Sequence, residues 1–305
     1  MARERRVAEP SCREITVAGR VNYTLEQPAS ATEVKVLSEN RPILDDKPGD
    51  ARVAGSRLAN LDLERHLTDP SIKQQFVTPM FDIIAPRYDR FTRVFSFGMD
   101  RRWKRELEQW MDRTIVPTSR VLDLACGTGD LAFAAGPRAT DGDVCGIDAS
   151  PNMIAIAHER AITEAMDTPV RFAVGDMSRL DVPSSTIDVV TAGYGLRNVP
   201  DHEQAVREIA RVLKPGGTLA TLDFYRPESP LWRRLFLGYL KASGDIVGWL
   251  WHREPVVYGY IAPSIDHFVS WQRFSTTLER CGLRVDRVRT KLLGGVALHF
   301  ATRVD

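Results

Sequence analysis

The 305-residue sequence has few cysteines and no excess of charge of either sign. It contains 41 lysines and arginines against 40 aspartates and glutamates, whereas a nucleic-acid-binding protein needs a basic face or stripe. We therefore expect no nucleic acid among its partners. The cysteines form no Cys-x-x-Cys pair, which excludes a zinc ribbon or a disulfide framework and favours a reducing compartment. They lie far apart, at Cys12, Cys126, Cys145 and Cys281.

Long apolar runs are also missing. No stretch approaches the ~18 consecutive apolar residues that a membrane-spanning helix needs. The first residues lack the apolar core of a signal peptide, and the acidic residues as far as Asp69 are not typical of a transit peptide. The sequence therefore predicts a cytoplasmic protein with enough apolar residues, 43% of the chain, to bury a full core. It predicts no metal site.

Residues 1–75 differ in amino-acid composition from the rest of the chain. They contain few large apolar side chains and are interrupted by Pro10, Pro28, Pro42, Pro48 and Pro70. This composition predicts an N-terminal extension that is loosely ordered or lies across the surface. The alternatives are a dimer arm, which leaves a homodimer open, and a flap over the active site. The main domain is expected over residues 76–305.

Short apolar strands alternate with amphipathic helices after Pro117. Strands are expected at residues 120–125, 143–147, 170–174, 187–192 and 218–223, and helices at 130–135, 151–165 and 202–213. A turn over 214–217 precedes the fifth strand. A helix over 265–281 and strands at 284–289 and 296–302 follow. Strands that alternate with helices predict an α/β protein with a parallel sheet covered on both faces.

One further helix is expected before the sheet. Its apolar residues Trp103, Leu107 and Trp110 recur at helical spacing, and Asp100 is the expected cap.

Two glycines, Gly127 and Gly129, stand at the turn between the first strand and its helix, where they let a ligand approach the main chain. Asp148 ends the second strand, 19 residues after Gly129, where a carboxylate can accept both hydroxyls of a ribose. Asp176 follows the third strand and can bind an adenine amino group. Ligands bind outside the carboxyl ends of such strands, so this pattern predicts a nucleoside site. The alternative is that these residues are helix caps and loop polar residues.

Both a dinucleotide and S-adenosyl-L-methionine contain adenosine, so the charge of the side chains at the site must distinguish between the two ligands. A pyrophosphate favours a helix N-terminus free of negative charge. Here Asp130 begins the helix after the glycines, and Asp123 lies in the strand before them. These carboxylates suit the ammonium and sulfonium of S-adenosyl-L-methionine, and no second nucleotide-binding half follows. Methyl transfer is therefore favoured over hydride transfer.

Four blocks of the sequence resemble the C-methyltransferases of ubiquinone and menaquinone biosynthesis. They are Phe81–Asp89 with Ser96–Gly98 and Trp103–Lys104, Val121–Asp130, Gly195–Val199, and Arg211–Gly217 with Gly294–His299. The resemblance covers about residues 76–302. It implies the class I S-adenosylmethionine-dependent methyltransferase fold, a mostly parallel seven-stranded sheet with an antiparallel last strand and helices on both faces. It also implies an N-terminal helical cap at 76–115 and a substrate lid at 228–262.

The resemblance implies S-adenosyl-L-methionine as cofactor, bound at the ends of successive strands. The expected contacts are Asp123, Gly127, Thr128, Gly129, Asp148, Ala149, Asp176, Met177 and Gly193. Gly193 stands where this family often has serine, so a hydroxyl contact is lost. The long N-terminal extension and Phe300–Arg303, in place of the usual Arg-Gly-x-Lys, are the other departures.

The implied reaction is C-methylation of a prenylated hydroquinone, and we expect demethylmenaquinol to be converted to menaquinol. The alternatives are the benzoquinol acceptor of the ubiquinone pathway, another phenolic small molecule, and a catalytically silent subunit with a methyltransferase fold. A ring carbon becomes a good nucleophile when the adjacent hydroxyl loses its proton, and a fixed cation or donor stabilises that phenolate.

Arg197 and Asn198, just after the fourth strand, are the expected stabilising residues. A salt bridge from Arg197 to Asp201 or Glu203 is the alternative. Tyr88 and Asp89 are expected to close over the cofactor, with ordinary helix packing as the alternative. The histidines that titrate near neutral pH are candidate bases, each with a structural role as the alternative: His202, His267 and His299.

Residues 231–251 combine aromatic and basic side chains, among them Trp232, Trp249, Arg233, Arg234 and Lys241. This combination suits a membrane interface, where a prenylated quinol resides. We therefore expect peripheral contact with a membrane, and the alternative is a lid packed on the sheet.

Overall fold

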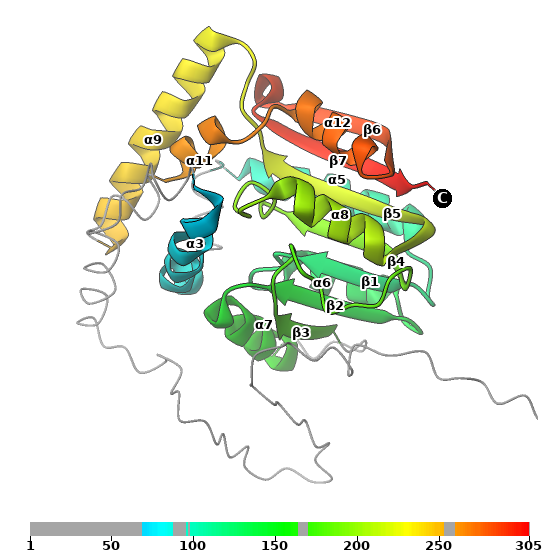
Figure 1. The fold of residues 1–305 in the computed structure, drawn as a ribbon. Helices are drawn as coiled ribbons and strands as arrows, with labels where there is room; N and C mark the ends of the chain where they lie inside the picture. The colour runs from blue at the N-terminus through cyan, green and yellow to red at the C-terminus, as the bar shows by residue number, and fades with distance from the viewer. Residues whose placement is uncertain (1–68, 88–95, 97, 164–169, 253–259, 305) are drawn as a thin grey trace, which may run out of the picture.

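The computed structural model describes residues 69–87, 96, 98–163, 170–252 and 260–304. They form a seven-stranded sheet with helices on both faces (Figure 1). In spatial order the strands are β3 (Val170–Val174), β2 (Asp143–Asp148), β1 (Arg120–Leu124), β4 (Ile187–Gly193), β5 (Leu213–Phe224), β7 (Val296–Arg303) and β6 (Leu283–Lys291). The expected α/β class and the positions of all seven strands are confirmed.

The order of the strands places a switch point between β1 and β4. From β1 the chain moves outward to β2 and β3, then returns to β4 on the other side of β1. The pairs among β1 to β5 are parallel, whereas β7 runs antiparallel to both β5 and β6. In such a sheet, ligands bind outside the carboxyl ends of the strands at the switch point.

Each face of the sheet buries its own hydrophobic cluster. One face is covered by α5 (Met99–Thr114), α6 (Asp130–Ala135) and α7 (Pro151–Thr163), which bury Leu107, Leu131 and Met153. The other is covered by α8 (His202–Val212) and α12 (Trp271–Arg280), which bury Ile209 and Phe274. Burial on both faces fixes the strands in register, so the turns at their carboxyl ends are held rigidly.

Three helices gather beyond the carboxyl ends of the parallel strands (Figure 1). They are α3 (Pro70–Ile84), which continues as a 3-10 turn at Ala85–Arg87, then α9 (Pro230–His252) and α11 (Ile261–His267). Helix α3 begins six residues before the expected domain boundary at 76, with proline at its first position, where no N–H is needed. Residues 1–68, which make up most of the expected extension, lie outside the described residues.

The prediction of one helix over residues 265–281 is wrong. Phe268 is extended, with φ −80° and ψ 169°, and it separates α11 from α12. The Ser270 hydroxyl then accepts a hydrogen bond from the Arg273 N–H at 3.4 Å and begins the second helix. Serine is a favoured N-cap residue, so Ser270 was a signal for this break that the helical spacing of apolar residues obscured.

Two smaller expectations need correction. Residues 214–217 do not form a separate turn before the fifth strand, because β5 already begins at Leu213 and the irregularity lies inside its pairing with β4. Asp100 is not the cap of α5, which begins at Met99 after Gly98 with φ 73°. The buried Asp100 carboxylate instead accepts a hydrogen bond from the Ser96 hydroxyl at 2.8 Å.

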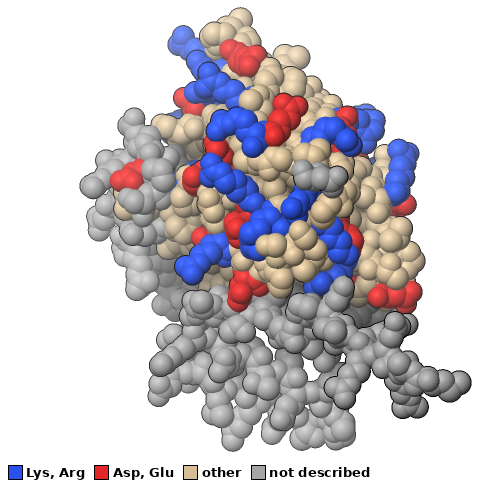
Figure 2. All heavy atoms as spheres, turned by 45° about the vertical axis from the view of Figure 1, so that its right-hand side comes forward, with Lys and Arg blue, Asp and Glu red and all other residues tan. Residues whose placement is uncertain are grey.

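The edge strand β6 is lined with charged side chains. Arg284 pairs with Asp286 at 2.9 Å, and Lys291 pairs with Glu106 of α5 at 2.7 Å. Figure 2 shows basic and acidic side chains lying next to one another over one face of the molecule. Charges on an edge strand discourage pairing with a second chain, which the exposed main chain of β6 would otherwise invite.

Candidate functional site

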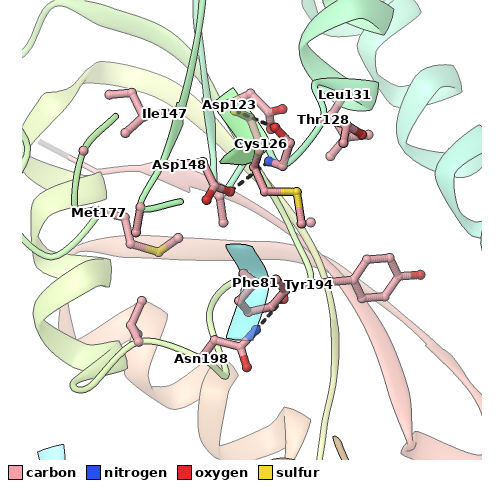
Figure 3. Close-up of a pocket in the computed structure, with 18 of the residues that line it drawn as sticks. Phe81, Asp123, Cys126, Thr128, Leu131, Ile147, Asp148, Met177, Tyr194 and Asn198 are labelled. Atoms are coloured by element: carbon pink, nitrogen blue, oxygen red, sulfur yellow. Dashed lines mark hydrogen bonds between the residues drawn. The ribbon is translucent and has the colours of Figure 1, made fainter. Parts of the chain in front are cut away.

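A pocket of about 960 Å³, part of it open to solvent, lies at the carboxyl ends of the parallel strands. All the expected cofactor contacts except Gly129 line it (Figure 3). Gly129 instead shapes the turn, with φ 97°, and an added Cβ would lie 2.7 Å from the Phe133 ring.

The turns that follow β1 and β4 lie in close contact beside this pocket. An added Cβ on Gly195 would lie only 2.3 Å from the Ala125 Cβ, so no side chain fits there. Ala125 and Tyr194 both have positive φ, 50° and 60°, a conformation that costs free energy in residues other than glycine. Strain of this kind persists only where surrounding packing enforces it, and here it shapes the pocket wall.

Asp148 ties the glycine turn to the end of β2. Its Oδ2 accepts a hydrogen bond from the Gly127 N–H at 2.9 Å, and its Oδ1 accepts one from the Ser150 N–H at 2.8 Å. Burial raises the pKa of Asp148, while these backbone donors lower it. An ionised carboxylate offers about four lone-pair sites, so each oxygen can accept a further hydrogen bond from a ligand hydroxyl.

Asp123 is a fully buried carboxylate in the pocket wall. Its Oδ1 accepts a hydrogen bond from the Thr191 hydroxyl at 2.7 Å, and its Oδ2 has no hydrogen-bond partner among the described residues. Burial raises its pKa, the Thr191 hydroxyl and the Ala132 main chain oppose the shift, and the pKa is raised to about 7. An orphaned buried carboxylate oxygen favours a cationic group in the pocket, because such a group supplies the missing partner.

Asp130 offers less uncompensated negative charge to a ligand than its position in the sequence indicated. It lines the pocket at the start of α6, but Lys104 binds its carboxylate at 2.7 Å and Arg160 binds it at 2.8 Å. Burial raises its pKa, and these two cations together outweigh burial, so the pKa is lowered overall. Because Asp130 is compensated, the preference for a cationic ligand depends on Asp123 instead.

The remaining expected cofactor residues complete this wall of the pocket. Asp176 is exposed, and its Oδ1 accepts a hydrogen bond from the Ser178 N–H at 2.8 Å, which leaves Oδ2 available. Met177 and Thr128 are buried, and Ala149 lies between Asp148 and Ser150. At Gly193, an added Cβ would lie 3.1 Å from Leu131, so a serine there would require a small shift of that side chain.

The opposite wall comes from a helix that sequence reasoning assigned in part to the extension. Gln74, Val77 and Phe81 of α3 line the pocket, and Lys104 of α5 also reaches it. The apolar spacing of Val77, Phe81 and Ile84 was a signal for this helix. Pro79 lies within the helix and weakened that signal.

Asn198 lines the pocket, whereas Arg197 does not. The Arg197 guanidinium is 5% exposed, and its Nη1 donates to Asp223 Oδ1 at 2.8 Å and to the Tyr194 carbonyl at 2.9 Å. The alternative partners named from the sequence are therefore wrong, since Asp201 caps α8. The Asn198 amide donates to the same Tyr194 carbonyl at 3.1 Å (Figure 3).

The other candidate catalytic residues are either not described or not part of the pocket lining. Tyr88 and Asp89 fall outside the described residues. His202, His267 and His299 do not line the pocket. His299 is a buried residue of β7, its Nδ1 meets the Tyr225 hydroxyl at 3.3 Å, and burial lowers the pKa of His299 to about 4. The geometry therefore favours the structural alternative for these histidines.

None of the described helices is long and apolar enough to cross a membrane. Helix α9, within the expected lid at 228–262, contributes no described residue to the pocket. It packs Phe236 and Leu240 against the core, which agrees with the alternative of a helix packed on the sheet.

The chain matches the model of the ubiE/COQ5 methyltransferase family over residues 70–303. It is 33% identical over 228 residues to the demethylmenaquinone methyltransferase of Lactiplantibacillus plantarum, covering 74% of this chain and 95% of that protein. It is 36% identical over 225 residues to the demethylmenaquinone methyltransferase of Thermus thermophilus, covering 73% of this chain and 100% of that protein. The family match begins at the first residue of α3.

A solved structure of a putative methyltransferase from Bacillus halodurans resembles this chain with a TM-score of 0.51. The two are 16% identical, and the alignment covers 65% of this chain and 98% of that one. At this identity the likeness establishes the fold alone. The expected methyltransferase fold is confirmed.

Proposed function

Because this chain belongs to the ubiE/COQ5 methyltransferase family, and is therefore a methyltransferase, we propose that it C-methylates a prenylated hydroquinone with S-adenosyl-L-methionine as donor. Demethylmenaquinol is the proposed acceptor, which the names of the relatives from Lactiplantibacillus plantarum and Thermus thermophilus support. The family name also covers ubiE-type enzymes, so a benzoquinol is the second candidate. The observation that carries the proposal is that Asp148 and the unpartnered Oδ2 of Asp123 lie in the same pocket wall, where one ligand can bind both carboxylates.

We call this wall the cofactor side: Asp123, Gly127, Thr128, Asp148, Asp176 and Met177. Asp148 would hold the ribose hydroxyls with the lone pairs that Gly127 and Ser150 leave available. Asp176 would accept the adenine amino group, and Asp123 would face the cationic methionine portion. When bound, S-adenosyl-L-methionine supplies an electrophilic methyl group. The residues fit this ligand, because a cation satisfies the one buried carboxylate oxygen of the wall that lacks a partner.

We call the facing wall the acceptor side: Gln74, Val77, Phe81, Asn198 and Val199. Val77 and Phe81 would bury an aromatic ring, and Asn198 would orient one of its oxygens. Helix α3 covers this side and limits the access of water. Positioning of this kind supplies much of the rate enhancement when the donor is already electrophilic.

The exposed face of α9 supports contact with a membrane surface. Leu231, Leu235, Tyr239, Ile246 and Trp249 are all exposed, and at 100° per residue they fall within an arc of about 80°. Arg234 and Lys241 lie along its flank and are also exposed. We propose that this stripe lies in the headgroup region of the bilayer that holds the prenylated acceptor.

Liposome flotation tests the membrane contact. Wild-type protein should float with vesicles that contain anionic lipid, and the double variant Leu235→Ser/Trp249→Ser should float less. An Arg284→Ser variant on β6 is the matched surface control. Equal flotation of wild type and the double variant would contradict contact through this stripe.

Methyl transfer to naphthoquinol and benzoquinol analogues, offered side by side with labelled S-adenosyl-L-methionine, tests the function. We expect both to accept methyl groups and the naphthoquinol to have the larger kcat/KM. A larger value for the benzoquinol would move the acceptor to the second candidate. Absence of transfer to either, together with no S-adenosyl-L-methionine binding by calorimetry, would indicate a catalytically silent subunit.

A further inference from the structure

The positive charge expected from Arg197 is neutralised within the fold. Its guanidinium binds the fully buried carboxylate of Asp223 at 2.8 Å, and the Arg197 N–H also donates to Asp223 Oδ2 at 3.2 Å. The pair therefore adds no net charge beside the acceptor side. A phenolate that develops on the acceptor needs a cation from another residue.

Two lysines lie close to the pocket: Lys104, which lines it and shares Asp130 with Arg160, and Lys73, which has no ion-pair partner among the described residues. It lies in α3, next to the pocket-lining Gln74, and its ammonium donates a hydrogen bond to the Arg197 carbonyl at 2.8 Å. Arg197 precedes Asn198, which lines the pocket, so the Lys73 ammonium lies directly behind the acceptor side, although Lys73 itself, like Arg197, is not among the lining residues. It forms no salt bridge with any residue that the structure describes.

The groups around Lys73 leave one net positive charge. Arg197 and Asp223 cancel each other, and the pKa of His202 of α8 is lowered, because burial and then Lys73 outweigh the opposing carboxylates of Asp201 and Glu203. Tyr260, which begins α11, is neutral because burial raises its pKa. Burial and the nearby Arg197 lower the pKa of Lys73 and Asp223 opposes them, so that the pKa of Lys73 is lowered to about 8.

We propose that Lys73 is a positioning residue that holds the Arg197–Asn198 turn and supplies the positive charge that stabilises the acceptor oxyanion. This inference rests on the proposed transfer of a methyl group to a phenolic acceptor. In that reaction the acceptor hydroxyl first releases its proton to solvent, and a ring carbon–methyl bond forms as the methyl–sulfur bond breaks. The ring carbon then loses its hydrogen as a proton while the oxygen regains one, so one proton is released in total.

The pH dependence separates the charge of Lys73 from its hydrogen bond. A neutral lysine amine still has two N–H donors, so it can hold the Arg197 carbonyl after it has lost its charge. An arginine at this position stays charged at every accessible pH. The contribution of charge should therefore disappear from the wild type at high pH, while the contribution of the hydrogen bond should remain.

The experiment measures kcat under anaerobic conditions, at saturating S-adenosyl-L-methionine and a short-chain naphthoquinol, from about pH 6 to about pH 10. Wild type should exceed Lys73→Met at least about tenfold at pH 7, and the ratio should fall as Lys73 loses its proton, to the level that the hydrogen bond to the Arg197 carbonyl alone contributes. Lys73→Arg should retain its advantage over Lys73→Met at high pH. A wild-type to Lys73→Met ratio that is constant across pH would overturn the proposal.

A second readout does not depend on turnover. A nitronaphthol, whose phenolate absorbs at longer wavelength than its phenol, is titrated in complex with the protein and S-adenosylhomocysteine. We expect the pKa of the bound probe to be about one unit lower in wild type than in Lys73→Met. If no quinol is methylated but this shift is seen, the proposed function fails and the role of Lys73 stands. If methylation proceeds and the shift is absent, the role of Lys73 fails.

Two further variants serve as controls, one for loss of any lysine and one for failure of Lys73→Met to fold. Lys214→Met removes a lysine that pairs with Asp188 at 2.8 Å in the first residues of β5, outside the pocket, and should leave both readouts unchanged. Lys73→Gln keeps an N–H donor without the charge, and it replaces Lys73→Met in both measurements if that variant does not fold.

Discussion

The cofactor side and the acceptor side of the pocket are held together over very different distances along the chain. On the cofactor side, Asp148 binds the main chain of Gly127, 21 residues away. On the acceptor side, Lys73 binds the main chain of Arg197, 124 residues away. The first contact joins two successive strand ends, whereas the second requires a helix that precedes the whole sheet to fold back over it.

The two sides also carry charge differently. Asp130, at the start of the helix after the glycine turn of the cofactor side, pairs with Lys104 of the opposite wall, and this pair is partly exposed, with Asp130 37% exposed. The ion pair of the acceptor side, Arg197 with Asp223, is almost completely buried. A pair open to solvent contributes little to stability, while loss of one partner from a buried pair leaves an uncompensated charge. The acceptor side should therefore be the more fragile of the two.

The largest expected effect comes from Asp223→Asn. Removing this charge leaves the Arg197 guanidinium buried and unneutralised, so we expect the free energy of unfolding to fall by about 3–5 kcal/mol. Urea denaturation followed by circular dichroism measures it. The double variant Asp223→Leu/Arg197→Met should recover most of the loss, because it removes both charges and replaces them with apolar volume.

Lys104→Met is the matched variant for the partly exposed pair with Asp130. Arg160 still pairs with Asp130 at 2.8 Å in this variant, and the pair is partly exposed, so the loss should stay below about 1 kcal/mol. A loss from Lys104→Met as large as that from Asp223→Asn would contradict the difference between the two sides.

The next effect in size concerns binding on the cofactor side. Asp148→Asn should weaken binding of S-adenosyl-L-methionine about 100-fold, or about 2.7 kcal/mol, because an amide cannot accept two ribose hydroxyls while holding both Gly127 and Ser150. Isothermal titration calorimetry measures the dissociation constant. Asp176→Asn is the control, and its exposed carboxylate should cost less than about tenfold. Equal losses would mean that Asp148 serves the turn and not the ligand.

The cofactor side could be predicted from the sequence because each of its contacts follows from local order along the chain. A glycine turn after one strand and an aspartate at the end of the next must meet in a parallel sheet, and Gly127 and Asp148 do so. The helix start at Pro151 was predicted for the same kind of reason, since the Ser150 hydroxyl accepts the Met153 N–H at 3.1 Å.

The acceptor side could not be predicted in this way. Arg197 was identified by its place after β4, but nothing local indicates that Asp223, at the end of β5, is its partner. Lys73 precedes the region where strands and helices alternate, and its position depends on how α3 packs on the finished sheet. Such contacts depend on tertiary packing. The sequence pattern predicts only which helices and strands form, and not which of their side chains meet.

The smallest of these effects is a pH dependence that belongs to the cofactor side. Asp123 has a pKa raised by burial to about 7, and its ionised form is the one that attracts a cationic ligand. The ionised fraction grows from about one tenth at pH 6 to about nine tenths at pH 8, so the dissociation constant for S-adenosyl-L-methionine should fall about tenfold over this range. Calorimetry at a series of pH values measures it.

The stability of the ligand-free protein should change in the opposite direction. Because the pKa of Asp123 is higher in the folded chain than its usual value of 3.8, the folded state binds more protons between about pH 4 and about pH 7. The free energy of unfolding that this residue contributes is therefore present below pH 4 and is lost as pH rises to 7. Asp123→Asn should flatten both profiles, since it removes the titrating group and leaves the Thr191 hydrogen bond possible. Profiles that keep their slopes in this variant would place the titration elsewhere, and Asp148, whose pKa burial also raises, would be the residue to replace next.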